Sequence, residues 1–324
     1  MALSSSGAQR TPIGGRRWHF HHGPIDIIIG ADGDALALAA AHEESWQRFE
    51  TVLVELVAEL PMLRRAIAPA DVAPGLSDPC PLQGRISRRM WSACRPFRAG
   101  FITPMAAVAG AVAEELVAHY QRPGIARAWI NNGGDVALHL AAGKSLRVGL
   151  FADLARFDPS DDSSDLRTDA SFSVDADLPV RGIATSGWRG RSFSFGIADS
   201  VTVLARTATE ADAAATVIAN AVDVPGDARI VRRPACELKD DTDLGSRLVT
   251  YDVLPLPAAA VHEALRAGRE RALQLRASGL IWSAILVCQG WFASIEDATP
   301  QRLAACAAAS SAPESTAGES RSIR

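Results

Sequence analysis

Two short apolar segments that meet at Gly23 and Pro24, followed directly by a long helical pattern, constrain the fold of this chain most. Residues 16–30 read as two strands, because glycine and proline favour a turn between them. From about Asp32 to Leu60 the apolar side chains recur at helical spacing, and Pro61 marks the expected end of the helix. Paired strands that lead into one long helix indicate a domain in which sheet and helix pack together.

The rest of the chain continues this alternation. Helices are expected over residues 103–119, 210–222 and 258–278, and strands over 128–131, 201–205 and 281–288. We therefore predict one α+β domain over residues 16–300, with a mixed or antiparallel sheet packed by helices. The ends of the chain, residues 1–15 and 301–324, are expected to be disordered. The segments 69–83 and 153–179 are expected to be loops, the second rich in Ser and Asp.

Charge and cysteine usage exclude several classes of protein. The 33 basic and 37 acidic residues are mixed along the chain, which argues against a nucleic-acid-binding surface. No apolar run approaches the roughly 20 residues that a membrane-spanning helix needs. The polar first 15 residues do not resemble a secretory signal. Five cysteines without a C-x-x-C pair indicate free thiols, so we expect a cytoplasmic protein.

Four segments carry residues that suit a binding site. In the first, histidines at positions 19, 21 and 22 either begin a polar strand or hold a metal. In the second, a strand runs into a turn that contains Asn131, Gly133, Gly134 and Asp135. Glycines let a ligand approach the backbone, and the exposed N–H groups of such a turn can hold an anion. A simple hairpin turn explains the second segment equally well.

The third segment contains Thr185, Ser186, Gly187 and Arg189, whose hydroxyl, backbone and guanidinium donors could meet phosphate oxygens. A solvated polar turn is the simpler interpretation.

In the fourth segment, Thr209 is a candidate helix N-cap. Asp212 and Thr216 lie four residues apart and so share a helical face. A carboxylate and a hydroxyl suit Mg²⁺. The alternative is that Asp212 only complements the helix dipole, as acids in the first turn of a helix do.

Taken together, the last three segments resemble the ApbE-like FAD:protein FMN transferases in order and approximate spacing, over roughly residues 98–222. The resemblance implies that the turns at 131–135 and 185–187 line a site for FAD or FMN. It further implies that Asp212, Thr216 and the backbone carbonyl of Ala106 hold Mg²⁺. Thr103 stands at a nucleotide-binding position of those enzymes.

An even closer resemblance is to an uncharacterised ApbE-related family. It covers nearly the whole expected domain through residues 95–96, 101–110, 241–250, 278–281 and 289–290. This second family brings no established activity, and it leaves the role of residues 240–250 open between a site and a salt-bridged turn.

The chain departs from the transferases at three places. The transferases carry an acid where this chain has Thr103 and a Lys or Glu where it has Ala109. They also carry a histidine-containing segment that is absent here before Asp199. Asp199 could act as a base, or it could be an N-cap or a surface acid.

The expected function is therefore a Mg²⁺-dependent, transferase-like reaction on a flavin or related nucleotide, or a divergent derivative of it. The alternative is a non-catalytic binder of a flavin or another phosphorylated heteroaromatic ligand. An acceptor protein and a second copy of the chain are the macromolecular partners considered.

Overall fold

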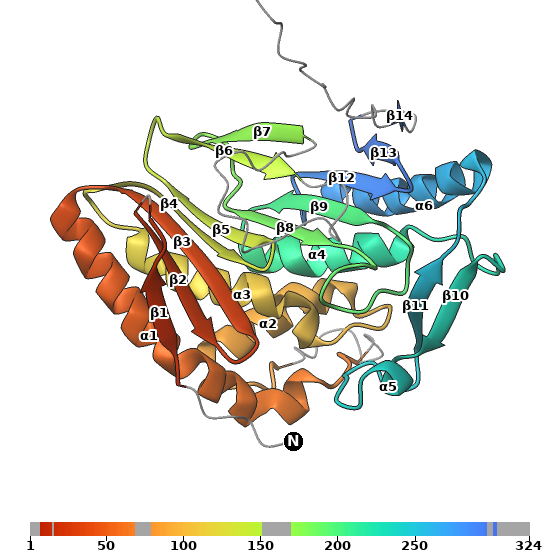
Figure 1. The fold of residues 1–324 in the computed structure, drawn as a ribbon, viewed down its shortest axis with the longest axis horizontal. Helices are drawn as coiled ribbons and strands as arrows, with labels where there is room; N and C mark the ends of the chain where they lie inside the picture. The colour runs from red at the N-terminus through yellow and green to blue at the C-terminus, as the bar shows by residue number, and fades with distance from the viewer. Residues whose placement is uncertain (1–6, 15, 69–78, 151–169, 297–300, 303–324) are drawn as a thin grey trace, which may run out of the picture.

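A computed structural model describes residues 7–14, 16–68, 79–150, 170–296 and 301–302. Its main element is a ten-stranded sheet in the order β1-β2-β3-β4-β5-β8-β9-β12-β13-β14, in which every neighbouring pair is antiparallel (Figure 1). The strands of this sheet are β1 (Gln9–Pro12), β2 (Arg17–His22), β3 (Ile25–Gly33), β4 (Ile125–Asn132), β5 (Asp135–Leu140), β8 (Gly182–Ser186), β9 (Ser200–Ala205), β12 (Ser283–Cys288), β13 (Trp291–Ser294) and β14 (Gln301–Arg302).

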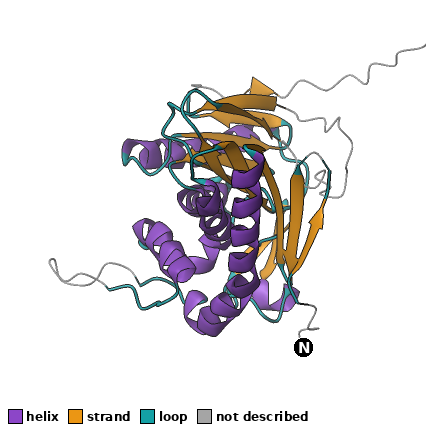
Figure 2. Cartoon of the chain, turned by 90° about the vertical axis from the view of Figure 1, so that its left-hand side faces the viewer, coloured by secondary structure: helices purple, strands orange, loops and turns teal. Residues whose placement is uncertain are grey.

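The long helices form a layer on one face of this sheet (Figure 2). They are α1 (Ala35–Leu63), α2 (Arg85–Cys94), α3 (Val108–Val117), α4 (Ala208–Ala221) and α6 (Ala258–Ala277). Shorter helical turns are η1 (Arg95–Phe97), η2 (Pro104–Ala107), η3 (Ala118–Tyr120) and α5 (Ala235–Leu238). The arrangement is the predicted α+β class.

Alternating residues of the strands face two separate cores. Ala184 and Val203 belong to the large core under the helices, whereas Ile183 and Leu204 belong to a small core on the other face. A hairpin of β6 (Ser145–Leu150) and β7 (Ala170–Asp175) contributes Val174 to the small core. Side chains of successive strand residues point to opposite faces. Along β5, β8 and β9, one side chain therefore faces the helices and the next faces the small core.

A second hairpin, β10 (Ile230–Pro234) and β11 (Leu248–Val253), lies beside the helical layer at one side of the molecule (Figure 1). Backbone N–H of Thr250 in β11 donates to the carbonyl of Ser194 at 2.8 Å, and the Thr250 hydroxyl donates to the carbonyl of Gly196 at 2.8 Å. The hairpin thus holds the loop that leads into β9.

Several predicted boundaries are wrong. Residues 9–12 form β1 and pair with β2, so this part of the expected disordered N-terminus is ordered by hydrogen bonds to the sheet. Helix α1 begins after the N-cap Asp34 and continues past Pro61 to Leu63. Residues 170–175, expected in a loop, form β7, and residues 301–302 form β14. The remaining parts of the predicted loops and tail, residues 69–78, 151–169 and 303–324, lie outside the described residues.

Candidate functional site

The predicted turn at residues 131–135 joins β4 to β5, and Asp135 is the first residue of β5. Gly133 and Gly134 adopt φ of 68° and 111°, which glycine tolerates best. Asn131 Oδ1 accepts the N–H of Gly134 at 2.8 Å, so the Asn131 side chain shapes the turn. Asp135 is only 8% exposed and accepts the backbone N–H of Thr185 at 3.3 Å.

Asp212 reaches the N-terminus of α3 from the neighbouring helix α4. Its Oδ2 accepts the N–H of Gly110 at 2.9 Å, and its carboxylate also receives the N–H of Ala109. The helices approach this closely because residue 110 is glycine: a Cβ there would lie 2.3 Å from the carbonyl oxygen of Ala208. Asn132 in turn donates its side-chain amide to the Ala109 carbonyl at 3.1 Å. The first turn of α3 is therefore held between the β4–β5 turn and α4.

Asp135 and Asp212 influence each other electrostatically. Burial raises the pKa of Asp212 to about 7, and the hydrogen bonds from Gly110 and Ala109 offset only part of that rise. Burial raises the pKa of Asp135 well above its ordinary value, and the nearby charge of Asp212 raises it further. Within the described ranges, no Lys, Arg or His forms an ion pair with either aspartate. We refer to Asp135 and Asp212 as the aspartate pair.

The donors around the aspartate pair suit a hard divalent cation. Thr216 follows Asp212 by one turn of α4 and is partly exposed. Ala106 lies in η2, which packs against α4. In the part of the chain that the structure describes, no three His, Cys, Asp or Glu side chains form a metal-binding group. Mg²⁺ nevertheless binds through one or two carboxylates together with water and substrate phosphates. Two carboxylates, a hydroxyl and a carbonyl fit that requirement.

Helix α4 corrects one sequence-based assignment. Its N-cap is Thr207, whose hydroxyl accepts the N–H of Glu210 at 3.2 Å, and not Thr209. Thr209 instead donates its hydroxyl to Glu114 of α3 at 2.6 Å. Asp212 is consequently the fifth residue of the helix and lies beyond the first turn, where the helix dipole acts most strongly. Complementing the dipole of its own helix does not explain Asp212.

The predicted residues of β8 divide between the two faces of the sheet. Thr185 Oγ1 lies 3.0 Å from Thr202 Oγ1, on the face of Ile183 and the small core. Only the backbone N–H of Thr185 reaches Asp135. Ser186 pairs with Val201 of the large core and so shares the helix face with the aspartate pair. Gly187 is needed for close approach, because a Cβ there would lie 2.3 Å from the carbonyl oxygen of Asp199.

Two further predicted residues serve the surrounding loops. The guanidinium of Arg189 lies 4.7 Å from the ring centre of Trp188, and Arg189 is exposed. Asp199 is buried, and its carboxylate accepts the indole N–H of Trp188 at 3.3 Å and the backbone N–H of Gln289 at 2.5 Å. Gln289 has a positive φ of 43° in the turn between β12 and β13. Asp199 therefore holds that turn and the Trp188 loop together, and each of its carboxylate oxygens accepts a hydrogen bond.

Thr103 is 2% exposed, and its hydroxyl donates to the carboxylate of Asp243. Sequence reasoning included Asp243 only within the segment 240–250, left open between a site and a salt-bridged turn, and Asn132 only within the turn 131–135; it did not select the thiol of Cys94. Cys94 is buried and donates to the carbonyl of Pro104 at 3.9 Å; burial and then the charge of Asp212 raise its pKa. The Asn-Asn repeat before the glycines was a signal for Asn132. Nothing in the local pattern pairs residue 103 with residue 243.

The histidines at the start of the sheet contact a neighbouring acid and one another. His19 Nε2 lies 3.0 Å from Asp26 Oδ1, and the rings of His19 and His21 have centroids 6.3 Å apart.

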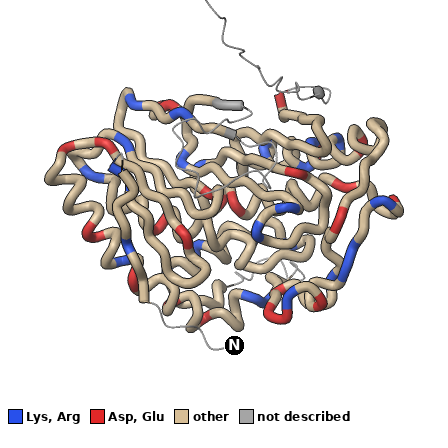
Figure 3. Tube along the Cα trace, in the orientation of Figure 1, with Lys and Arg blue, Asp and Glu red and all other residues tan. Residues whose placement is uncertain are grey.

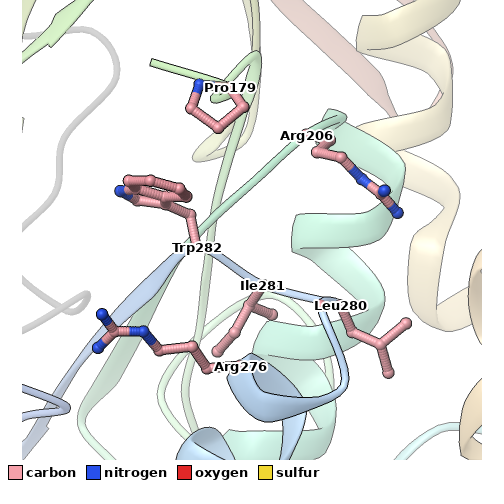
Figure 4. Close-up of a pocket in the computed structure, with 7 residues that line it drawn as sticks. Pro179, Arg206, Arg276, Leu280, Ile281 and Trp282 are labelled. Carbon is pink, nitrogen blue, oxygen red and sulfur yellow. The ribbon is translucent and has the colours of Figure 1, made fainter.

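A separate cavity of about 300 Å³ lies near the end of β9 opposite Asp199 (Figure 4). It is lined by Pro179, Arg206, Arg276, Gly279, Leu280, Ile281 and Trp282. Both arginines form ion pairs, Arg206 with Glu210 at 3.2 Å and Arg276 with Glu296 at 2.8 Å. The residues that line it include no acid, so this cavity offers no carboxylate to a cation.

The distribution of charged residues and the character of the helices bear on binding to nucleic acid and to membranes. In the view of Figure 3, Lys and Arg are interspersed with Asp and Glu. A search of the described residues finds no helix with the length and apolar character that crossing a bilayer requires.

Comparisons with known proteins find relatives over most of the chain. A family model described as AbpE bacteria matches residues 8–294. The UPF0280 protein of Methanopyrus kandleri is 36% identical over 216 residues, which cover 67% of this chain and 78% of that protein. The UPF0280 protein of Methanospirillum hungatei is 32% identical over 209 residues, with 64% and 76% covered. The UPF0280 protein of Methanothermobacter thermautotrophicus is 39% identical over 160 residues. That match covers 49% of this chain and 57% of the relative.

Proposed function

The chain belongs to the AbpE bacteria family and to the UPF0280 family, and from this premise we propose that it is a Mg²⁺-dependent protein acting on a flavin or related phosphorylated nucleotide. The single observation that supports this most is the aspartate pair. A buried carboxylate, Asp135, and a partly exposed one, Asp212, with raised pKa values and no basic partner among the described residues, favour a bound cation.

Residues from three segments would hold the ligand and its cation. Asp212, the hydroxyl of Thr216 and the carbonyl of Ala106 would bind Mg²⁺, with Asp135 beside them. When bound, Mg²⁺ neutralises phosphate charge and orients the phosphate groups. The turn at Gly133 and Gly134, together with Ser186, would face the nucleotide.

Transfer of FMN to a threonine hydroxyl needs a base to accept the hydroxyl proton. Asp199 was the candidate, and it already accepts hydrogen bonds from Trp188 and Gln289. Losing a general base costs about 10²–10⁴-fold in rate. We therefore propose that the protein binds the nucleotide with Mg²⁺ and transfers FMN to a standard acceptor poorly or not at all.

The test has two parts. Mass spectrometry of small molecules released from the purified protein identifies the ligand, and calorimetric titration measures Mg²⁺ binding by wild type and Asp212→Asn. We expect Asp212→Asn to bind Mg²⁺ more weakly, whereas Glu210→Gln on the same helix should bind like wild type. Equal Mg²⁺ binding by wild type and Asp212→Asn would overturn the cation site.

Flavin transfer is tested separately. The protein is incubated with FAD, Mg²⁺ and a flavinylation-motif acceptor, and the acceptor is examined by in-gel fluorescence. We expect no band above background. A strong band would overturn this proposal and assign the role of base to Asp199 or to another residue.

A further inference from the structure

The segment of residues 239–250 comprises the connection from α5 to β11 and the start of β11, and it contacts three distant parts of the chain. Arg64 at the end of α1 forms a two-bonded ion pair with Asp241. The guanidinium of Arg247 lies 3.5 Å from the ring centre of Phe101, and Thr250 holds the loop at Ser194 as described above. These contacts place the segment against the approach to η2 and against the loop that leads to Asp199.

Asp243 makes the innermost of these contacts. Its carboxylate accepts the hydroxyl of Thr103, the residue that precedes η2 and is almost fully buried. The carbonyl of Thr103 in turn accepts the N–H of Ala106 at 3.2 Å. A charged acceptor forms a stronger hydrogen bond than a neutral one, so Asp243 restrains the first residue of this turn from outside.

The turn held in this way lies next to the aspartate pair. Pro104, which follows Thr103, accepts a hydrogen bond from Cys94, and the charge of Asp212 reaches the Cys94 thiol. Helix α4, which carries Asp212, packs against η2. A displacement of η2 would therefore move the Ala106 carbonyl relative to Asp212 and Thr216.

We propose that Asp243 is a positioning residue of the cation site, which acts by holding Thr103 and, through it, the η2 turn that carries the Ala106 carbonyl. The transferases that this chain resembles carry an acid at the position of Thr103. In this chain the acid is Asp243, which reaches Thr103 from a distant part of the sequence. The inference rests on the proposed cation site. Asp243 touches neither the aspartate pair nor Ala106 in any recorded contact, so its effect is indirect.

The experiment measures Mg²⁺ affinity by calorimetry for Asp243→Ala, Asp243→Asn, Thr103→Val and the double variant Thr103→Val/Asp243→Ala. Residues that orient a metal ligand typically contribute about 10–100-fold to metal affinity. We expect a loss in that range for Asp243→Ala and Thr103→Val, and a smaller loss for Asp243→Asn, whose amide oxygen can still accept the threonine hydroxyl. The double variant should bind no more weakly than either single variant. Asp240→Ala is the matched control, because Asp240 is exposed on the same segment.

A second measurement separates this inference from the proposed function. Hydrogen exchange of metal-free protein, followed by mass spectrometry, should be faster across residues 104–110 in Asp243→Ala and unchanged in Asp240→Ala. If wild type binds no Mg²⁺, the proposed function fails and the exchange result alone decides the positioning role. Wild-type Mg²⁺ affinity in Asp243→Ala, or unchanged exchange over residues 104–110, would overturn the inference.

Discussion

Two pairs of acidic residues are enclosed by the helical layer, and their surroundings differ. Glu115 of α3 is 3% exposed and meets Arg48, Arg85 and Arg89, while the adjacent Glu114 also pairs with Arg89. Burial alone would raise the pKa of Glu115, but the hydrogen bonds from Arg48 and Arg89 outweigh it and leave the pKa below its ordinary value.

The aspartate pair has the opposite character. Its carboxylates accept only backbone N–H groups in the recorded contacts, and the pKa of each is raised. The glutamates of α3 are thus neutralised by the protein itself and join α1, α2 and α3. The aspartates have no such basic partner among the described residues, and burial favours their protonated form. Acids of the same chemistry thus differ in their cationic neighbours, and that difference sets the direction of their pKa shifts.

The largest expected effect on stability comes from removing the charge of Glu115, which arginines neutralise. Glu115→Gln removes the charge that Arg48 and Arg89 share, and a broken buried ion pair typically costs about 3–5 kcal/mol. We expect about 3 kcal/mol because Arg48 keeps Glu55 as a partner. Urea denaturation at pH 7 measures this loss. Glu43→Gln, which removes an exposed acid of α1, is the control and should be close to wild type.

For the aspartate pair we expect the opposite effect of charge on stability, because charge on Asp212 destabilises the folded protein. The folded-state pKa of Asp212 is raised from its ordinary 3.8 to about 7, so folding disfavours the charged form. Wild type should therefore lose stability as pH rises from about 4 to about 7, and Asp212→Asn should not lose this contribution. At about 1.4 kcal/mol per pKa unit, and with Asp212 partly exposed, we expect a difference of about 2 kcal/mol.

Urea denaturation of both proteins at pH 5 and pH 8, without divalent cation, measures that difference. Addition of Mg²⁺ at pH 8 should restore stability to wild type only. A difference between the two proteins that does not change with pH would mean that Asp212 is neutralised within the protein as Glu115 is.

Asp199 is a further buried acid. Its substitution tests whether it stabilises the fold, as Glu115 does, or belongs to the proposed cation site. Asp199→Ala leaves the N–H groups of Trp188 and Gln289 without their acceptor, and an unsatisfied buried donor costs about 1–3 kcal/mol. We expect this loss in urea denaturation, a smaller loss for Asp199→Asn, and unchanged Mg²⁺ affinity in both. A large loss of Mg²⁺ affinity with little loss of stability would place Asp199 in the site.

The smallest effects compare adjacent residues on opposite faces of β8. Thr185→Val breaks the contact with Thr202 on the far face and should cost about 0.5–1.5 kcal/mol of stability without changing Mg²⁺ or nucleotide affinity. Ser186→Ala, on the face of the aspartate pair, should change stability by no more than about 0.5 kcal/mol and weaken nucleotide binding. Calorimetric titration of both variants checks the assignment, which the reverse result would exclude.

Much of the fold could be predicted from local patterns. The turn at Gly23 and Pro24, the long helix after it, and the helices now assigned as α3, α4 and α6 follow from apolar spacing. The hairpin that presents Asp135 follows from its paired glycines. The α1 C-terminus was misplaced because Pro61 is accommodated in the last turn of that helix, and β1 was missed because its order comes from pairing with β2.

The sequence by itself selected Asp212 and Thr216 as candidate cation ligands from residue type and helical spacing, whereas it placed Asp135 in a turn expected to face a nucleotide. Only the tertiary structure decided their surroundings. It brought Asp135 and Asp212 together without a basic partner among the described residues, turned the Thr185 hydroxyl to the far face, and bonded Asp199 to Trp188 and Gln289. Spacing along a chain specifies which residues share one face of one element, whereas the charge state of a buried acid depends on neighbours that other elements supply.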